Sequence, residues 1–237
     1  MTKLEHEHTR EAIAARIAGA NHNYIRDFIY GGVDGAVTTF AVVSGVAGAE
    51  LSTKIVLILG FANLVADGFS MAASNFLGTR AEIDDYRRIE AIEYRHIELE
   101  PEGEREEVRE IYRAKGFAGE ELETAVALIT ADKERWVKTM LTEEYGLPAE
   151  IRSPWLAAFS TFSAVVICGV VPLLPYLFGA NSSFLVACLM TGITFFLIGS
   201  FKSRWSTHSW FRSGLETFSV GALAAGLAYG FGVLLKD

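Results

Sequence analysis

The sequence is poor in residues that could cross-link the chain or bind metal through sulfur. It has two cysteines, Cys168 and Cys188, and each lies within a run of apolar residues. Neither has the spacing to a second cysteine or a histidine that a metal site of this kind needs. We therefore expect no disulfide framework, and we interpret both cysteines as small buried hydrophobic residues.

The chain also lacks an excess of basic residues. Its 21 Lys and Arg stand against 29 Asp and Glu, a formal net charge of −8. Proteins that bind nucleic acid usually present a basic face, so no nucleic-acid partner is expected. The first 25 residues are polar and contain no apolar core of a signal peptide. We therefore expect the first long apolar run to act as the membrane-insertion signal.

Acidic and apolar residues are separated along the chain. Hydrophobic residues make up 51% of the sequence, and the mean hydropathy of +0.27 is high for a soluble protein with this many acids. The segment 80–150 holds 20 of the 29 acidic residues against 11 of the basic ones, which leaves a local balance of −9. The negative charge therefore belongs to one segment, whose field attracts cations.

Five apolar runs are long enough to cross a bilayer, which takes about 20 residues. They cover 28–49, 55–78, 154–180, 182–201 and 217–235, and the last could extend toward Arg212. Backbone polar groups in lipid must be hydrogen-bonded within the protein, so the runs are expected to be helices. The expected fold is all-α: a polytopic membrane protein with five transmembrane helices and a cytosolic, acidic three-helix domain inserted between spans two and three.

The expected domain boundaries follow from these runs. They are an N-terminal arm or helix at 1–25, a transmembrane hairpin at 26–79, the acidic domain at 80–150 and spans three to five at 151–237.

The distribution of Lys and Arg predicts the orientation in the membrane. One set of loop ends carries Arg10, Arg16, Arg26, Arg80, Arg87, Arg88, Arg152, Lys202, Arg204 and Arg212, whereas the other carries only Lys54 and Lys236. Basic flanks stay in the cytosol. We therefore expect the N-terminus and the acidic domain to be cytosolic and the C-terminus to be outside, with a prokaryotic plasma membrane as the host.

Three helices are expected in the acidic domain. The first covers about 79–99 and continues from the second span, until Pro101 and Gly103 interrupt it. The second covers about 104–115 and the third about 120–145. Apolar residues keep helical spacing along the third, and this predicts a core-facing stripe of Leu122, Val126, Ile129, Trp136 and Met140.

Ionisable residues inside the spans are candidate functional residues, because a carboxylate in the membrane is costly. Asp34, Asp67 and Glu216 qualify, and Thr38 lies one helical turn after Asp34. Asp67 also belongs to a stripe at i+4 steps, formed by Asn63, Asp67, Met71 and Asn75. A thioether among carboxylate and amide groups suits the path of a borderline-soft divalent ion. The alternative is a set of polar residues that hydrogen-bond one helix to another.

Glycines in the fifth span allow a close helix approach. Gly226 and Gly230 have the G-x-x-x-G spacing. Packing within one subunit and packing between two subunits are both compatible with this pattern.

The acidic domain contains pairs of metal-ligand types at helical spacing. Glu93-x-x-His96 and Glu104-x-x-Glu107 each place two ligands on one helix face. Met140 and Glu144, near the end of the third helix, could complete a metal site. The alternative is a solvated acidic face, because charge-rich helices produce Glu-x-x-Glu by chance.

Several segments together resemble the vacuolar iron transporter family. They are DFIYGGVDGAVTTFAVVSGVAGA from residue 27, ADGFSMAASNFLGTRAE from residue 66, PWLAAFSTFSAVVICGVVPLLPY from residue 154 and RSGLETFSVGALAAGLAYGFGVLL from residue 212. The five spans with one acidic insert match as well, and the resemblance covers about residues 24–237.

The resemblance implies a homodimer in the lipid bilayer that exports cytosolic Fe²⁺, or a related ion such as Mn²⁺ or Zn²⁺, in exchange for protons. It implies no tightly bound cofactor, because the metal is both substrate and bound ion. Asp34 and Met71 match the family's membrane pathway. The residues that match its cytosolic metal ligands are Glu93, His96, Glu104, Glu107, Met140 and Glu144. Two positions depart from the family pattern: His96 stands where the family usually has a glutamate, and Asn75, near the end of the second span, stands where many members have an acid.

Two other functions remain compatible with the sequence. One is a membrane-anchored ferroxidase-like enzyme that uses the Glu-x-x-His face, and the other is a metal-sensing membrane protein without transport. The polar residues inside the spans favour transport, because an anchor needs no polar path.

Overall fold

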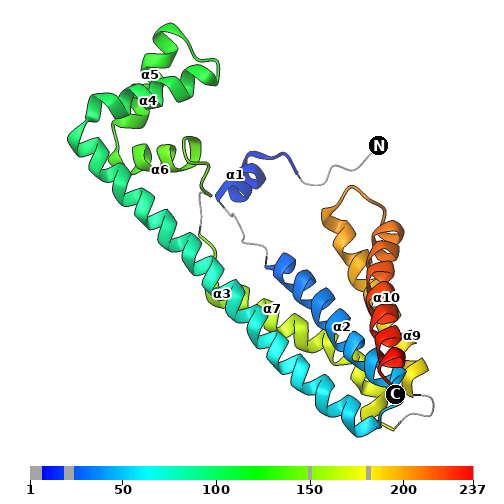
Figure 1. Cartoon of the computed structure of the whole chain (residues 1–237). Helices are drawn as coiled ribbons and strands as arrows, with labels where there is room; N and C mark the ends of the chain where they lie inside the picture. Colours follow the sequence, from blue (N-terminus) through cyan, green and yellow to red (C-terminus); the bar gives the residue numbers. More distant parts are fainter. Residues whose placement is uncertain (1–6, 19–23, 149–150, 180–182, 237) are drawn as a thin grey trace. The chain divides into compact units, whose positions relative to one another are not determined.

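The structure is a computed structural model of the chain, and it describes residues 7–18, 24–148, 151–179 and 183–236. Every regular element among these residues is a helix (Figure 1). The α-helices are α1 (Arg10–Ala18), α2 (Ile25–Gly48), α3 (Thr53–Leu99), α4 (Pro101–Ala114), α5 (Gly119–Thr130), α6 (Lys133–Glu143), α7 (Pro154–Gly169), α8 (Leu174–Leu177), α9 (Ser183–Lys202) and α10 (Trp210–Leu234). Short 3₁₀ turns, η1 (Val171–Leu173) and η2 (Ser203–Trp205), precede α8 and follow α9. The expected all-α class is confirmed for the described residues.

The chain forms two compact units, and the division falls inside α3. One unit, here called the insert unit, comprises 1–21 and 78–152, and the other, the membrane unit, comprises 22–77 and 153–237. Each unit has its own cluster of buried apolar side chains.

Five helices of the described chain are long and apolar enough to cross a membrane. They are Ile25–Gly48, Thr53–Leu99, Pro154–Leu177, Ser183–Trp205 and Trp210–Leu234. The expectation of five helices of sufficient length and apolar character is confirmed. The fifth helix starts at Trp210 rather than near residue 217, because Ser209 caps its first turn by accepting a hydrogen bond from the Arg212 N–H.

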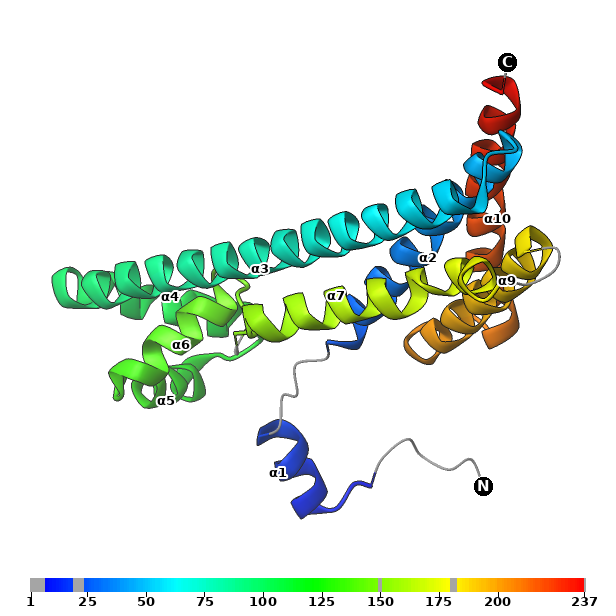
Figure 2. The same cartoon turned by 90° about the horizontal axis from the view of Figure 1, so that it is seen from below.

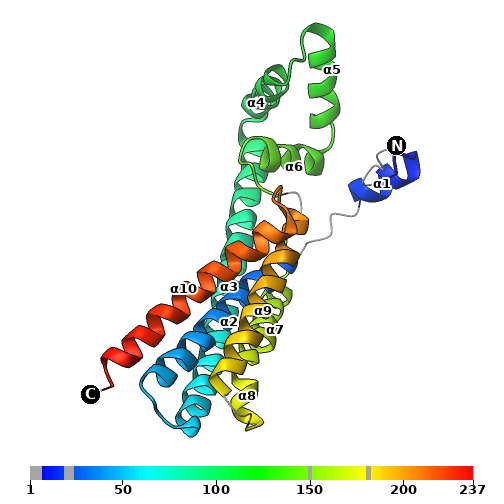
Figure 3. The ribbon, with the colours of Figure 1, turned by 90° about the vertical axis from the view of Figure 1, so that its right-hand side faces the viewer.

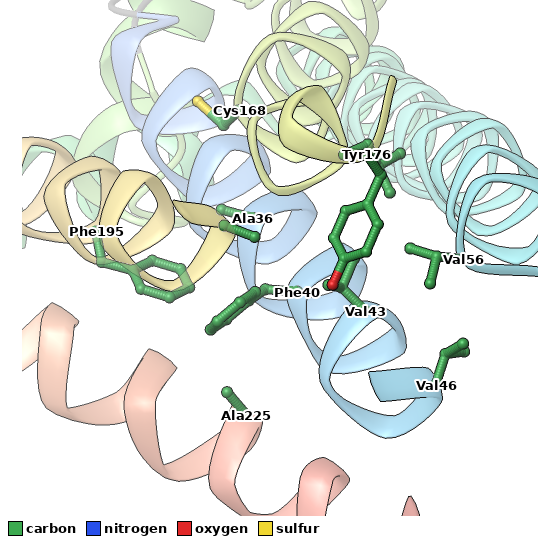
Figure 4. Close-up of a cluster of buried hydrophobic side chains, with 11 residues drawn as sticks. Ala36, Phe40, Val43, Val46, Val56, Cys168, Tyr176, Phe195 and Ala225 are labelled. Carbon is green, nitrogen blue, oxygen red and sulfur yellow. The ribbon is translucent and has the colours of Figure 1, made fainter. Parts of the chain in front are cut away.

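The core of the membrane unit surrounds α2. This helix packs against α7, α9 and α10, and Figure 3 shows these helices gathered beside it. Phe40, Val43 and Phe195 are buried in the core, where Tyr176 also lies (Figure 4). Many apolar side chains on the outer faces of α3, α9 and α10 are exposed, as expected for helices that contact lipid.

A glycine makes the closest approach of α2 to α7 possible. A Cβ atom added at Gly35 would lie 2.6 Å from the main-chain oxygen of Val165. No real side chain fits at that distance, so glycine at this position sets the separation of the two helices.

The insert unit differs from the expected three helices. The predicted helix at 120–145 is two helices, α5 and α6, because the chain bends at Ala131 and Asp132. The Asp132 carboxylate accepts a hydrogen bond from the Arg135 N–H at 2.8 Å and thereby caps a new helix. The first helix ends at Leu99, as predicted. The second starts at Pro101 instead of near residue 104, because proline is well tolerated at the first helical position.

Helices α4, α5 and α6 lie next to one another (Figure 2). Leu122, Val126, Trp136 and Met140 of the predicted stripe are buried in their common core, and Ile129 packs against it at the margin. Residues 10–18 form the helix α1, on which Ile13 is exposed, while Ala20 of the expected N-terminal helix lies outside the described residues.

Candidate functional site

Three helix segments of the insert unit supply the predicted metal ligands. Glu93 and His96 lie near the end of α3, Glu104 and Glu107 in the first half of α4, and Met140 and Glu144 at the end of α6. Of the six predicted ligands, direct contacts join Glu93, His96 and Glu104, and Tyr145 just after α6 also contacts Glu93.

Two of the glutamates are buried. Glu93 is 1% exposed and Glu104 is 5% exposed. One carboxylate oxygen of each, the Oε2 atom, has no hydrogen-bond partner among the described residues. A buried, unpaired carboxylate oxygen is unfavourable unless a proton or a cation neutralises it.

Histidine and tyrosine contact the remaining oxygens. His96 Nδ1 lies 3.3 Å from Glu104 Oε1 and 3.9 Å from Glu93 Oε1. The Tyr145 hydroxyl donates a hydrogen bond of 3.0 Å to Glu93 Oε1. His96 therefore bridges carboxylates of two helices, and its half-exposed ring leaves this group accessible from solvent.

The electrostatic environment favours a neutral or cation-bound state of the cluster. Burial, followed by repulsion from Glu107, Glu93 and Glu144, raises the pKa of Glu104 to about 7. Desolvation and then repulsion from Glu107 and Glu93 raise the pKa of Glu144 to about 7 as well. Glu93 and Glu104 are buried, whereas Glu107 and Glu144 are exposed and act on the other two through their charges.

The predicted ligands do not form a complete metal site. Among the described residues, no group of three or more His, Cys, Asp and Glu side chains is arranged so that it could hold a metal ion. Met140 is fully buried in the hydrophobic core of the insert unit. The metal-ligand set therefore stays a prediction, and it is one that the burial and the raised pKa values favour.

In the membrane unit, the two candidate aspartates lie near one another. Asp34 of α2 and Asp67 of α3 are close enough for their charges to interact. Thr38 donates its hydroxyl to Asp67 Oδ2 at 2.8 Å and lies 2.9 Å from the main-chain oxygen of Asp34. Two carboxylates this close repel one another unless a proton or a cation lies between them.

The polar stripe of α3 follows one half-buried face. Asn63, Asp67, Met71 and Asn75 are all partly buried, whereas Val65 and Phe69 between them are more than half exposed. The Asn63 Nδ2 atom is buried and has no hydrogen-bond partner in the described chain. The stripe therefore lies toward the interior of the membrane unit, on the side where Asp34 meets Asp67.

Sequence reasoning missed two residues. Asp27, in the first turn of α2, accepts a hydrogen bond of 3.0 Å from Asn75 Nδ2. Asn75 also donates to Thr161 Oγ1 at 2.8 Å. Asn75, which stands where many members of the resembled family have an acid, therefore has a carboxylate beside it, and that carboxylate is Asp27 of α2. Tyr145 was the second omission, and its position directly after Glu144 was the only signal in the sequence.

Glu216, the third candidate carboxylate of the spans, lines a cavity. It lies exposed on α10 and shares this cavity with Arg26 and Lys202. Asp34 and Asp67 are not among the residues that line this cavity.

The fold and these residues define a class: an all-helical protein with five helices long and apolar enough to cross a membrane, two neighbouring aspartates on these helices and an acidic helical insert. Residues 25–233 match the VIT family. The chain belongs to this family.

Relatives over nearly the whole chain agree with this assignment. The chain is 32% identical to the vacuolar iron transporter of Toxoplasma gondii over 226 residues, which is 90% of this chain and 75% of the relative. It is 31% identical to vacuolar iron transporter 1 of Eucalyptus grandis, over 87% of this chain and 84% of the relative. For vacuolar iron transporter 1 of Arabidopsis thaliana the identity is 30%, over 96% and 90%.

Proposed function

We propose that this protein transports Fe²⁺, or a related divalent ion such as Mn²⁺ or Zn²⁺, out of the cytosol in exchange for protons. The relatives are named vacuolar iron transporters. The observation that carries the proposal is that Thr38 links the two aspartates of the spans: its hydroxyl lies 2.8 Å from Asp67 Oδ2 and 2.9 Å from the main-chain oxygen of Asp34.

Exchange follows from the chemistry of this pair. With a proton on one carboxyl group, the pair is stable without metal. A divalent cation displaces the proton, because it neutralises both carboxylates at once. One site that holds either a proton or a metal couples the two fluxes in opposite directions.

Met71 and Asn63 extend this site along α3. A thioether and an amide oxygen offer soft and hard ligands in succession, which suits ions between the two extremes such as Fe²⁺ and Zn²⁺. The half-buried face of Asn63, Asp67, Met71 and Asn75 is thus the proposed path.

The insert unit is the proposed collector of the ion. Glu93 and Glu104 offer buried oxygen ligands and the half-exposed His96 a nitrogen ligand, and the local charge of the segment raises the cation concentration near them. Basic flanking residues favour an orientation with this unit in the cytosol. The prokaryotic plasma membrane stays a prediction, because the relatives are named for the vacuole.

A homodimer is part of the proposal. A Cβ atom at Gly226 or at Gly230 would have no described atom within 4 Å. These glycines therefore do not bring helices together within the described chain. We infer that their G-x-x-x-G face packs against a second copy of the protein.

A ferroxidase-like activity has less support. Such an enzyme holds two irons about 3.5–4 Å apart and usually draws on two Glu-x-x-His motifs. The sequence has one on the relevant helix face, at Glu93 and His96.

The proposal is tested in proteoliposomes under an imposed pH gradient, with Fe²⁺ influx and lumenal pH recorded in the same vesicles. The wild type should move both ions. Asp34→Asn keeps the shape of the side chain but cannot exchange a proton for a metal, so both fluxes should stop. Glu50→Gln is the control, since this exposed glutamate pairs with Lys236 outside the proposed path. Wild-type fluxes in Asp34→Asn would refute the coupling role, and formation of Fe³⁺ without uptake would indicate the enzyme.

A further inference from the structure

A cavity of about 490 Å³ lies in the membrane unit and is lined by three charged side chains, Arg26, Lys202 and Glu216. Arg26 is the second residue of α2, and Lys202 is the last residue of α9. Glu216 lies two turns into α10. The start of α2, the end of α9 and the start of α10 thus meet around it, and we call it the charged cavity.

The three charges are not paired with one another. Within the part of the chain that the structure describes, none of them takes part in an ion pair or a hydrogen bond. This contrasts with Glu50 and Lys236 in the same unit, which form an ion pair at 2.6 Å. Opposite charges that share a cavity without contact leave room for a ligand that carries both signs.

The walls of the cavity change from polar to apolar along the helices. Arg26 and Lys202 lie at helix termini, and Trp205 lies in η2 directly beyond α9. Val33 and Val220 lie seven residues after Arg26 and four residues after Glu216, further into the spans. Trp and Lys or Arg are typical of the membrane–water interface. A free phosphate or a metal ion would not need the apolar wall, whereas a lipid would.

We propose that the charged cavity binds a phospholipid with a primary amine in its headgroup, of the phosphatidylethanolamine type. Its phosphate lies between Arg26 and Lys202, its ammonium group donates hydrogen bonds to Glu216, and the start of an acyl chain contacts Val33 and Val220. The site is separate from the proposed metal path, so it does not depend on transport.

Glu216 selects among headgroups. Phosphatidylglycerol offers no cation to this carboxylate, so Glu216 remains unpaired when it binds. Phosphatidylcholine carries a cation, but its methylated nitrogen has no N–H to donate. Only a primary ammonium satisfies both the charge and the hydrogen-bonding capacity of Glu216.

The test measures lipid binding to the delipidated full-length protein by native mass spectrometry in detergent. Titrations with phosphatidylethanolamine, phosphatidylcholine and phosphatidylglycerol should show the ethanolamine lipid bound most tightly. Glu216→Gln should weaken its binding about tenfold, since a charge-assisted hydrogen bond is lost, and should leave phosphatidylglycerol binding unchanged or tighter. Lys202→Gln should weaken binding of all three lipids.

Two matched variants serve as controls. Glu50→Gln and Arg212→Gln change the same charges in the membrane unit outside the residues that line the cavity, so lipid binding should match the wild type. Equal ethanolamine-lipid binding in wild type and Glu216→Gln overturns the proposal. Binding of free phosphoethanolamine as tight as that of the lipid overturns the lipid assignment. A shift from dimer to monomer in Glu216→Gln, without a change in lipid binding, would instead make the cavity a contact between two copies.

Discussion

Replacing Glu104 by glutamine should stabilise the insert unit at neutral and alkaline pH while removing a proposed metal ligand. Burial and three neighbouring glutamates raise the pKa of Glu104 from its ordinary value of 4.5 to about 7. The folded state therefore retains a proton that the unfolded state has already released between these two values. The contribution of Glu104 to stability is therefore most favourable below about pH 4.5, falls as the pH rises through this window and becomes a constant penalty above about pH 7.

The size of the penalty follows from the shift. A difference of one pKa unit corresponds to about 1.4 kcal/mol, so the ionised Glu104 carboxylate costs the fold about 3 kcal/mol at pH 8 and less than about 1 kcal/mol at pH 5. Glutamine has nearly the same shape and carries no charge. Glu104→Gln should therefore recover up to about 3 kcal/mol at pH 8 and much less at pH 5.

Hydrogen exchange in the full-length protein, followed by mass spectrometry on peptides from α4 and α6, measures the opening free energy of this unit at both pH values. Glu102→Gln is the matched control, because it removes the same charge from an exposed side chain of the same helix. A gain of the same size at pH 5 and pH 8 would show that ionisation is not the cause. No gain at pH 8 would refute the electrostatic account of the cluster.

Three further predictions follow from single contacts. Tyr145→Phe removes the hydroxyl that donates to the buried Glu93 carboxylate and should destabilise the insert unit by about 1.5–3 kcal/mol in the same exchange experiment. Asn75→Asp places a second carboxylate beside Asp27, so thermal stability in detergent should fall and should recover when millimolar Mn²⁺ is added. Gly35→Ala forces a Cβ atom against the main chain of α7. Overpacking of this kind destabilises a fold by about 1–3 kcal/mol, so the melting temperature should fall.

Each of these has a control within the chain. In the double variant Glu93→Gln with Tyr145→Phe, the stability loss seen in Tyr145→Phe alone should disappear, because no charged acceptor is left without its donor. Asn75→Ala should lose stability without any rescue by Mn²⁺, since it adds no carboxylate. Gly78→Ala should keep or raise the melting temperature, because nothing lies within 4 Å of the added atom. A rescue of Asn75→Ala by Mn²⁺ would contradict the carboxylate-pair reasoning.

Composition alone was sufficient to predict the spans, because lipid contact requires long apolar helices whatever their neighbours. The split between α5 and α6 also left a trace in the sequence. The apolar stripe skips from Ile129 to Trp136, and the next expected member would fall on Lys133. Asp132 directly before that lysine is a typical N-cap, but the regular spacing on both sides favoured a single helix.

Contacts between helices could not be predicted in the same way. Helical spacing placed Asn63, Asp67, Met71 and Asn75 on one face, and the structure agrees that this face is the half-buried one. The partners of that face depend on how α2 and α3 are aligned, which no local pattern encodes. The hydrogen bond from Asn75 to Asp27 joins residues 48 positions apart, and it was therefore absent from the sequence-based prediction.

The distribution of basic partners distinguishes the proposed ligand glutamates from the rest of the acidic insert. Surface glutamates pair with arginine: Glu102 with Arg105, Glu106 and Glu123 with Arg109, and Glu110 with Arg113. Within the described chain, Glu93 and Glu104 have no Arg or Lys partner, although they are the most buried of these carboxylates. An arginine at such a site would satisfy them permanently and exclude a second cation. Leaving them to a histidine and a tyrosine keeps the cluster short of positive charge, which the proposed divalent ion would supply.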